Sequence, residues 1–535
     1  MNLVALADEN LHDFGEYPFL IFENKILTNK QLLHHANRLA NGLRNLNVQK
    51  GDNVVVMLPN CPEVLISYQG ILRRGAVIIP LISLLNEKEL THILGNCAAV
   101  AMITTRDIFQ KNEATLRTIA SLKHLILTDE SIPRGTIDFR SLISDHSEDP
   151  NFPSIGEDDL AVILYTAGTT ATPKGVMLTH RNLYSNAVNA SYAHGTQAKD
   201  TTLVALPLSH SFGITTMNKA YKYGNLHILM RKFQADEAFK LIEKYKVTDV
   251  PGVPAMFITL LNSPDAGRYD LSSLKICLSG AAPFPVANLM AFEKKFNCTV
   301  FEAYGLSEAS PAVSTNYHNR PTKPGSVGQP IPEVEVRIVD DQDHDVHRGD
   351  VGELLVKGPN VSTGYYKLPE ETAKTFRDGW LHTGDMARMD EDGYLYIVER
   401  KKDLIIRGGF NIYPRDIEGI LYQHPAVKDA VAIGVPDPVM GEEVKVYVVL
   451  KEGNTGVEEL LQYCKNQLAK YKWPKFIKFV ESLPRIRWER YCAKNCESST
   501  HERFILNNEG LTVPTHMRSH WTYHQTRRGS FLDSI

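Results

Sequence analysis

The segment LYTAGTTATPKGVMLTHRNL, which runs from Leu164 to Leu183, combines residue types that together bind anions. The apolar run before it predicts a strand that leads into threonines, glycines and a lysine. Small and hydroxyl-bearing residues let several backbone N–H groups converge on one anion, and Lys174 adds a mobile positive charge. The order differs from a Walker A loop, because Pro173-Lys174-Gly175 stands where that loop has Gly-Lys followed by Ser or Thr. The segment therefore predicts a binding loop for a triphosphate, which we call the phosphate cradle.

Two carboxylates stand in segments that suit the rest of a nucleotide. Glu308 ends the segment EAYGLSE, and a carboxylate beside a phosphate cradle suits a hard cation such as Mg²⁺. Asp385 ends WLHTGD, and a carboxylate can accept hydrogen bonds from both vicinal hydroxyls of a ribose. Farther along, Gly408 and Gly409 are adjacent glycines, which permit a ligand to approach the backbone closely.

The elements that must position these residues alternate between helical and strand patterns before about Pro324. Residues 29–46 carry apolar side chains at helical spacing, and the run 53–58 (NVVVML) is typical of a buried strand. This alternation favours a parallel sheet wrapped by helices. It continues through a helix at 61–73 and strands at 76–81, 98–104, 202–206, 226–229, 274–278 and 299–301.

After Pro324 the pattern changes twice. Residues 333–340 and 352–357 alternate in polarity, as half-buried antiparallel strands do. The basic run ERKKD at 399–403 then precedes a smaller unit, and we interpret it as a hinge near Lys402; a solvated surface run is the alternative. The smaller unit has helices at 412–424 and 457–468 and strands at 427–434 and 443–450. The predicted divisions are residues 1–399, residues 400–485 and an atypical tail at 486–535.

Composition limits the classes of protein that the chain can represent. Its 535 residues are 43% hydrophobic and 22% charged, which is ordinary for a globular protein and long enough for roughly three to four domains of about 150 residues. The net charge of −4 gives no reason to expect nucleic-acid binding. The start lacks a signal-peptide pattern, no stretch has the ~20 apolar residues of a spanning helix, and the seven cysteines are scattered. We expect a cytoplasmic protein, with peripheral membrane contact and oligomeric state left open.

The 164–183 segment resembles the phosphate-binding signature of the adenylate-forming superfamily, which includes acyl-CoA synthetases, firefly luciferase and peptide-synthetase adenylation domains. The usual form is Tyr-Thr-Ser-Gly-Thr-Thr-Gly-x-Pro-Lys-Gly, from which this chain departs at Ala167 and Ala171. Both departures suggest a modest weakening of ATP binding. The segments LPLSHSFG, SGAAP, EAYGLSE, WLHTGD and ERKKDLIIRGGFNIYP follow in the order that the superfamily has.

The resemblance implies a role for each matching residue. Lys174, His210, Glu308 and Lys402 are implied as catalytic residues, with His210 bordering the acyl pocket and Lys402 at the hinge. Thr170 and Glu308 are implied as Mg²⁺ ligands, and Gly408 and Gly409 as part of a pantetheine tunnel. The implied nucleotide-binding set is Thr166, Ala167, Gly168, Thr169, Thr170, Lys174, Gly280, Ala281, Ala282, Glu302, Ala303, Tyr304, Gly305, Ser307, Asp385 and Arg400.

The fold and reaction follow from the same resemblance. It implies an α/β fold, with a large N-terminal domain of parallel sheets wrapped by helices plus a β-rich subdomain, and a small mobile α+β C-terminal domain. A carboxylate would attack the α-phosphate of ATP·Mg²⁺, and coenzyme A would then displace AMP from the acyl-adenylate. The chain most resembles bacterial fatty acid–CoA ligases, so a medium- or long-chain fatty acid is the expected substrate. Gly213, Met217 and residues 252–257 are candidate walls of the acyl pocket or parts of the core. The alternatives are an aryl or other carboxylate ligase of the same superfamily and a decayed, non-catalytic nucleotide- or acyl-binding protein.

The end of the chain departs from the superfamily, which closes with Gly-Lys-Ile-x-Arg and whose lysine bridges the carboxylate and the α-phosphate. Here the lead-in VESLPR is followed by IRWERYCAKNC. A shifted reading frame can be written by joining the third base of each codon to the first two bases of the next codon. In this frame the codons of Trp488 and Glu489 can only encode Gly, and permitted codons elsewhere give Asn-Pro-Met-Gly-Lys-Ile-Leu-Arg-Lys-Glu-Leu. Our hypothesis is that one nucleotide is missing near the Arg485 codon, so that residues 486–535 are out of frame. A chain without this lysine is expected to be impaired in adenylation and to keep the thioester-forming step.

Overall fold

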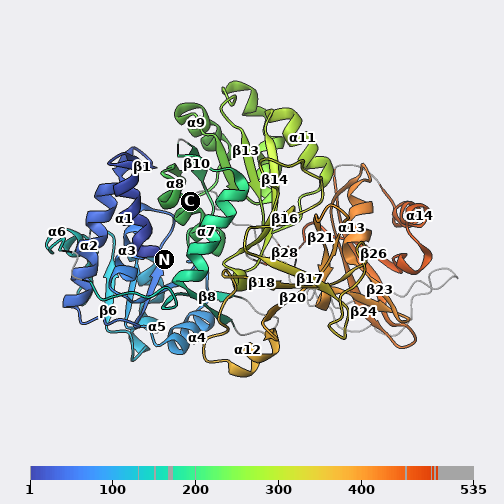
Figure 1. Cartoon of the computed structure of the whole chain (residues 1–535). Coiled ribbons are helices and arrows are strands. Elements are labelled where there is room, and N and C mark those ends of the chain that lie inside the picture. Colours follow the sequence, from blue (N-terminus) through green and yellow to red (C-terminus); the bar gives the residue numbers. More distant parts are fainter. Residues whose placement is uncertain are drawn as a thin grey trace, which may run out of the picture.

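The computed structural model describes residues 2–130, 132–149, 152–166, 173–198, 200–451 and 455–483, with the backbone of 485–486 and 490–491. In Figure 1 the chain runs from blue N-terminal layers through green helices and yellow strands to an orange C-terminal unit at the opposite end. The α/β class predicted from the sequence is confirmed by this architecture.

A seven-stranded sheet has the order β7-β6-β5-β3-β4-β8-β9, with parallel neighbours except for the antiparallel pair β8–β9. Its strands are β3 (Asn53–Met57), β4 (Val77–Pro80), β5 (Ala101–Thr104), β6 (His124–Leu127), β7 (Ile137–Asp138), β8 (Leu160–Thr166) and β9 (Lys174–Thr179). The helices of this part are α1 (Leu3–Phe14), α2 (Asn29–Asn45), α3 (Pro62–Arg73), α4 (Glu87–Cys97), α5 (Arg106–Thr118) and α6 (Phe139–Ser144).

A nine-stranded sheet has the order β16-β15-β14-β13-β12-β10-β11-β1-β2, and its central strands are parallel. Its strands are β1 (Pro18–Phe22), β2 (Lys25–Thr28), β10 (Thr201–Val204), β11 (Leu226–Leu229), β12 (Asp249–Gly252), β13 (Ile276–Ser279), β14 (Thr299–Gly305), β15 (Ala312–Thr315) and β16 (Gln329–Pro330). Its helices are α7 (His180–His194), α8 (Ser211–Tyr223), α9 (Ala235–Tyr245), α10 (Pro254–Asn262) and α11 (Val286–Phe296), with 3₁₀ turns η1 (Pro264–Arg268) and η2 (Ser307–Ala309).

The two sheets share a helical layer, because one apolar core contains side chains from both of them. Val54 and Val56 of β3 belong to this shared core, together with residues of α2, α3, α7 and α8. The alternate residues Val55 and Met57 face a second core formed with α4 and α5. The strand NVVVM is therefore buried on both faces, as its continuous apolar run predicts. A third core lies against α9, α10 and α11 on the far face of the nine-stranded sheet.

A β-rich subdomain and a C-terminal unit complete the described chain. The β-rich subdomain has β17 (Glu335–Val339), β18 (Gly352–Lys357), β19 (Phe376–Arg377), β20 (Trp380–Met389) and β21 (Leu395–Arg400), all in antiparallel pairs, and α12 (Pro369–Thr375). The C-terminal unit has η3 (Lys401–Asp403), β22 (Ile405–Arg407), β23 (Phe410–Ile412), α13 (Pro414–Tyr422), β24 (Val427–Asp437), β25 (Gly441–Leu450), α14 (Val457–Gln467), η4 (Lys470–Lys472) and β26 (Phe476–Phe479). The short strands β27 (Arg485–Ile486) and β28 (Arg490–Tyr491) pair with each other.

The C-terminal unit starts its first helix later than the sequence predicts. The helix expected from residue 412 begins at Pro414, since proline suits the first helical position and Ile412 is paired with Ile405 in a hairpin. The five described cysteines are all unpaired and buried. No helix in the described ranges combines the length and apolar character needed to cross a membrane.

Candidate active site

The predicted phosphate cradle joins two antiparallel strands. β8 ends at Thr166 and β9 begins at Lys174, and these two residues are partners in the sheet register. Both strands carry buried apolar residues, so the sheet fixes the two ends of the intervening segment. The other cradle predictions and both departures from the usual signature lie outside the described residues: Ala167, Gly168, Thr169, Thr170 and Ala171.

Both ends of the cradle face a cavity of about 850 Å³, whose walls come from α7, α8, β12, β13, β14, α12, β20 and η3. The cavity brings together most of the described site predictions, namely Thr166, Lys174, His210, Gly280, Ala281, Ala303, Tyr304, Gly305, Ser307, Glu308, Arg400 and Lys402. The other described predictions do not line it: Ala282, Glu302, Asp385, Gly408 and Gly409.

Lys174 and Glu308, the charges expected at the phosphates, are joined through the ring of Tyr365. Lys174 Nζ lies 5.5 Å from the centre of this ring, and the Tyr365 hydroxyl donates a hydrogen bond to Glu308 Oε1 at 2.9 Å. Lys174 Nζ also lies 2.6 Å from Glu371 Oε2 of α12. This contact lowers the pKa of Glu371, because the ammonium stabilises the ionised carboxylate. The lysine is thus held at the cavity wall by a carboxylate that the sequence did not indicate.

Tyr304, Asp385 and Arg400 form a second polar group at the cavity. The Tyr304 hydroxyl donates to Asp385 Oδ2 at 2.6 Å, and Arg400 Nε lies 3.3 Å from Asp385 Oδ1. Burial and the neighbouring carboxylate raise the pKa of Tyr304 well above its ordinary value, so the phenol stays protonated and donates. Asp385 lies behind the other two, with 8% of its side chain exposed, and fixes the positions from which they line the cavity.

Glu302 does not line the cavity although it belongs to the same strand as Tyr304. Its residue surface is 7% exposed, and its Oε2 accepts a hydrogen bond from the Gly325 N–H at 3.1 Å. Burial raises the pKa of Glu302 to about 7, and the hydrogen bond from Gly325 opposes this only in part. The side chain therefore supports the loop at Gly325 from inside the fold.

α8 presents one face to the cavity and another to the core. His210 caps the helix and accepts a hydrogen bond from the Phe212 N–H at its Nδ1 at 3.3 Å. Gly213 lies on the core side, where a Cβ would come within 2.2 Å of the Pro207 carbonyl oxygen. Met217 is also buried in the shared core.

The residues considered as acyl-pocket walls do not line the cavity. Neither Gly213, nor Met217, nor any residue of 252–257 lines the cavity. Gly252 packs closely on the Phe257 ring, where a Cβ would lie 2.9 Å from the ring carbon Cζ. The structure places Met217 and Phe257 in buried apolar cores, which favours the core alternative for these two residues.

An ion pair that the sequence did not indicate lies at the cavity wall. Lys219 of α8 and Asp249 of β12 both line the cavity, with their charged atoms 3.0 Å apart. The only signal in the sequence is spacing. Lys219 lies seven residues after Phe212, which places both residues on the same face of a helix. Asp249 is 30 residues farther along the chain and carries no local signal.

The predicted hinge is tied to the β-rich subdomain by ionic contacts. Lys401 Nζ lies 2.9 Å from Asp341 Oδ1 and 3.0 Å from Glu353 Oε2, and its neighbour Lys402 lines the cavity. Burial lowers the pKa of Lys401, but hydrogen bonds to both carboxylates outweigh it and raise the pKa above the ordinary value.

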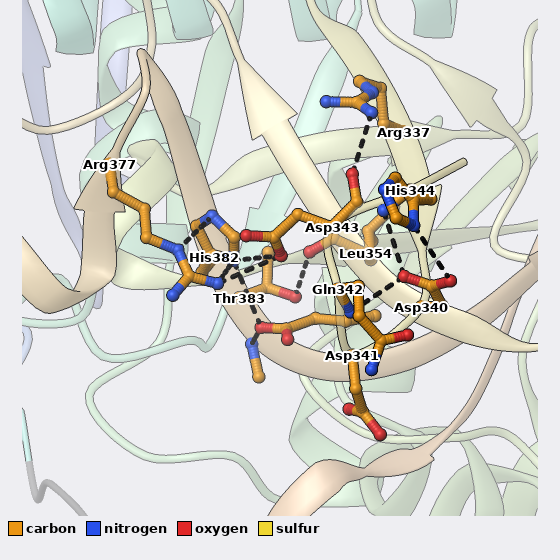
Figure 2. Close-up of polar contacts among 12 residues, drawn as sticks. Arg337, Asp340, Asp341, Gln342, Asp343, His344, Leu354, Arg377, His382 and Thr383 are labelled. Carbon is orange, nitrogen blue, oxygen red and sulfur yellow. Dashed lines mark hydrogen bonds and ion pairs between the residues drawn. The ribbon is translucent and has the colours of Figure 1, made fainter. Parts of the chain in front are cut away.

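Asp341 belongs to an acidic loop at residues 340–345 that folds on itself beside the cavity. Figure 2 shows Asp340, Gln342 and His344 bonded within this loop, and Arg377 between Asp343 and His382. Arg377 Nη2 lies 3.1 Å from Asp343 Oδ1, and Arg377 and His382 line the cavity. The loop thus connects one wall of the cavity to the hinge.

Gly408 and Gly409 form a tight turn in the C-terminal unit. They separate the paired residues Arg407 and Phe410 and have φ values of +57° and +83°. Two successive positive φ angles are what a two-residue hairpin turn requires, and glycine adopts them without strain. A Cβ on Gly408 would also meet the side chain of Met440 at 2.6 Å.

With this geometry in place, comparison with known proteins identifies the family. Residues 7–366 match the family described as AMP-binding enzyme, and residues 416–489 match the AMP-binding enzyme C-terminal domain. The chain belongs to the AMP-binding enzyme family. The predicted resemblance to adenylate-forming enzymes is confirmed by this match.

Relatives within the AMP-binding enzyme family span nearly the whole chain. A long-chain-fatty-acid–CoA ligase of Bacillus subtilis is 39% identical over 514 residues, covering 90% of this chain and 92% of that protein. A feruloyl-CoA synthase of an Amycolatopsis species is 37% identical over 462 residues, covering 86% and 91%. The crystal structure of ATP-bound MatB from Rhodopseudomonas palustris has a TM-score of 0.84 at 31% identity, covering 91% of this chain and 96% of that chain.

Proposed function

We propose that this AMP-binding enzyme is an ATP-dependent acid–thiol ligase that converts a medium- or long-chain fatty acid to its CoA thioester through an acyl-adenylate. The observation that carries the proposal is the single cavity shared by Lys174 and Glu308, by Tyr304 and Arg400, and by the face of α8 that follows His210. Relatives named as acid–CoA ligases and an ATP-bound neighbour support it.

The proposed nucleotide site uses the polar groups in separate roles. Thr166 and Lys174 mark the phosphate end, where backbone amides of the cradle add to the lysine charge. The ring of Tyr304 provides a face for the base, and Ser307, which lines the same cavity, is the proposed contact to a phosphate. Arg400 holds the ribose at the cavity wall, and Asp385, which does not line the cavity, contributes to the ribose site by keeping Arg400 and Tyr304 in position from behind.

The oxygen ligands available at the phosphate end fit a magnesium ion. Mg²⁺ is usually bound by one or two carboxylates together with substrate phosphates, and Glu308 supplies one carboxylate beside the cradle. The proposed ligands are Glu308 and Thr170, of which Thr170 lies outside the described residues. When bound, the ion would neutralise negative charge on the phosphate oxygens.

The proposed reaction has two displacements at one site. The acid carboxylate attacks the α-phosphate of ATP and pyrophosphate leaves; the thiol of coenzyme A then attacks the acyl carbonyl and AMP leaves. The chain's residues contribute orientation of the reactants and charge at the phosphoryl oxygens. Lys174 provides that charge at the phosphates, while His210 borders the carboxylate at the start of α8.

The second displacement requires a rearrangement, since Gly408 and Gly409 do not line the cavity in the present arrangement. We infer that residues 400–485 rotate against residues 1–399 about Lys402, which lies in the short turn between β21 and β22. Such a rotation would bring the glycine turn to the pantetheine arm. Phe410 beside this turn is 58% exposed, which supports a face that docks elsewhere during the cycle.

The proposed activity is incomplete in one respect, because the chain lacks the usual lysine at its end. The residues that would show a replacement, from Ile486 onward, lie almost entirely outside the described residues. We propose that residues 486–535 are out of frame and that the first displacement is slowed by ~10²–10³, as when one positioned charge is lost at a transition state. The second displacement does not use that lysine. The expected location in the cytoplasm also stays a prediction.

Pyrophosphate release measured with a panel of acids tests the proposal. Release with saturated acids of medium or long chain supports a fatty acid–CoA ligase. Release with aryl acids alone would favour the second candidate, which the feruloyl-CoA relative supports. Absence of release with every acid, together with absence of thioester formation from supplied adenylates, would favour the decayed binding protein that the missing lysine suggests.

A further inference from the structure

The cavity carries a buried ion pair that the proposed function does not use. Lys219 Nζ lies 3.0 Å from Asp249 Oδ2, and the two side chains are 12% and 11% exposed. Asp249 Oδ2 also accepts a hydrogen bond from the Thr202 hydroxyl at 3.3 Å. Desolvating two charges costs several kcal/mol, so a pair that faces a binding cavity calls for an explanation through the ligand.

The elements place this pair away from the reacting end. Phe212, Thr215, Thr216 and Lys219 line the cavity from one face of α8, at the spacing of successive helical turns. At 1.5 Å per residue, Lys219 lies about 10 Å farther along the helix than Phe212. Asp249 reaches the same wall from the first position of β12. An acid whose carboxylate lies near the start of α8 therefore points its other end toward Lys219 and Asp249.

The other hydroxyls around this end are already satisfied. Ser191, Thr215 and Thr216 each donate to a backbone carbonyl at 2.6–2.9 Å, so they add little capacity for a ligand. Within the described residues, Lys219 has one hydrogen-bond partner, Asp249. An ammonium has three donors, which leaves two of them for a group that enters the cavity.

The nearby histidines are neutral and do not compete with the ion pair for a ligand. Burial and, to a smaller extent, the Lys219 charge lower the pKa of His194 and of His227 to about 3. His194 lines the cavity as a neutral ring and shares a hydrogen bond of 2.9 Å with Thr315 Oγ1. The inner end is therefore neutral overall, with one donor group and one acceptor group side by side at the cavity wall.

This arrangement discriminates between kinds of acyl end. An alkyl end would cover the ion pair without replacing the water that solvates it, which is unfavourable. A second carboxylate would lie beside Asp249 and meet like-charge repulsion. A hydroxyl can accept from Lys219 and donate to Asp249 at once, so it satisfies both groups without disturbing their pairing.

We propose that this subsite binds a hydroxyl carried by the acid far from its carboxylate, so that the preferred substrate is a hydroxylated fatty or aryl acid. The proposal rests on the proposed ligase function and refines its substrate class. A site built to bond a substrate hydroxyl rejects analogues without it much more strongly than an apolar pocket rejects an extra methylene.

The test compares matched pairs of non-hydrolysable sulfamoyl adenylates by calorimetry. One pair is decanoyl and 10-hydroxydecanoyl, and the other is cinnamoyl and 4-hydroxycinnamoyl; AMP alone is the reference. We expect the hydroxylated member of one pair to bind about tenfold to a hundredfold more tightly, as for a hydrogen bond to a charged group. The pair that shows the preference identifies the hydroxyl's source as chain or ring. Equal affinities within both pairs, or a preference for the unsubstituted members, would overturn the proposal. Binding of AMP in the same experiment would still support the proposed ligase site. Failure of AMP and every adenylate to bind would instead reject the proposed function.

A double variant reverses the chemistry of the subsite. Lys219→Met with Asp249→Leu replaces the ion pair by apolar side chains of similar size, which folded proteins often tolerate. We expect it to lose the preference for the hydroxyl and to bind the unsubstituted adenylate more tightly than the unaltered chain does. The matched control is Lys240→Met with Asp236→Leu, an exposed pair on α9, which is expected to leave all affinities unchanged. A preference that survives in the Lys219 and Asp249 variant would refute the assignment.

Discussion

Glu302 offers a sharp distinction between a nucleotide-binding residue and a structural one. The sequence assigns it to the adenine segment, whereas the structure buries it against the Gly325 loop. Its folded pKa of about 7 lies above the ordinary 4.5, so the folded state binds the proton more tightly than the unfolded state. The carboxyl therefore lowers stability progressively as the pH rises from about 4.5 to 7, and the full loss persists above that range.

The size of the effect follows from the two pKa values, which correspond to about 3 kcal/mol. The variant Glu302→Gln keeps an oxygen for the Gly325 N–H and removes the titration. We expect it to gain on the order of 3 kcal/mol of unfolding free energy relative to the unaltered chain between pH 4.5 and pH 8. Because Glu302 does not line the cavity, AMP affinity is expected to stay within about twofold.

Urea denaturation at several pH values, with AMP calorimetry at pH 8, measures both quantities. The exposed Glu335→Gln serves as the control, since its side chain lies on the surface of β17. A difference between Glu302→Gln and the unaltered chain that does not vary with pH would refute the linkage argument. A loss of AMP affinity of tenfold or more would refute the placement of Glu302 behind the site.

Three further experiments test separate contacts. Tyr304→Phe and Asp385→Asn, combined in a double-mutant cycle, are expected to show a coupling of about 1–3 kcal/mol in unfolding free energy, because the hydroxyl and carboxylate lie 2.6 Å apart and buried; a coupling near zero would contradict this. Lys174→Met should weaken ATP about tenfold or more and AMP far less by calorimetry, since AMP lacks the outer phosphates; an equal loss for both would move the lysine away from those phosphates. Gly409→Ala, at a φ of +83°, should destabilise the hairpin by about 1–2 kcal/mol and slow thioester formation from supplied adenylate, as followed by chromatography, without changing AMP affinity; an unchanged thioester rate would separate this turn from the CoA step.

The sequence predicts well what is contiguous along the chain. The strand before Thr166 and the lysine after the cradle follow each other within ten residues, so their order alone predicts an anion site beside a strand end. The buried strand at 53–57 is similarly visible, because both of its faces need apolar residues.

The sequence does not predict contacts between segments that lie far apart along the chain. Glu371 pairs with Lys174 across 197 positions, and Asp385 bonds Tyr304 across 81, with no periodic pattern to relate them. Gly213 is a candidate pocket wall in the sequence because it follows His210. One face of the helix packs on the core and another lines the cavity, and the sequence does not indicate which residues lie on which face. Lys219, on the cavity side of the same helix, is the residue that this ambiguity concealed.

We propose that this chain forms acyl-CoA at the cavity lined by Lys174, Glu308 and Lys402. The most direct measurement supplies a synthetic acyl-adenylate and coenzyme A to the full chain and follows acyl-CoA and AMP by mass spectrometry. We expect both products to form in equal amounts, even where pyrophosphate release from ATP is slow. A folded protein that binds AMP and yet yields no acyl-CoA from any alkyl, hydroxyalkyl or aryl adenylate would contradict it.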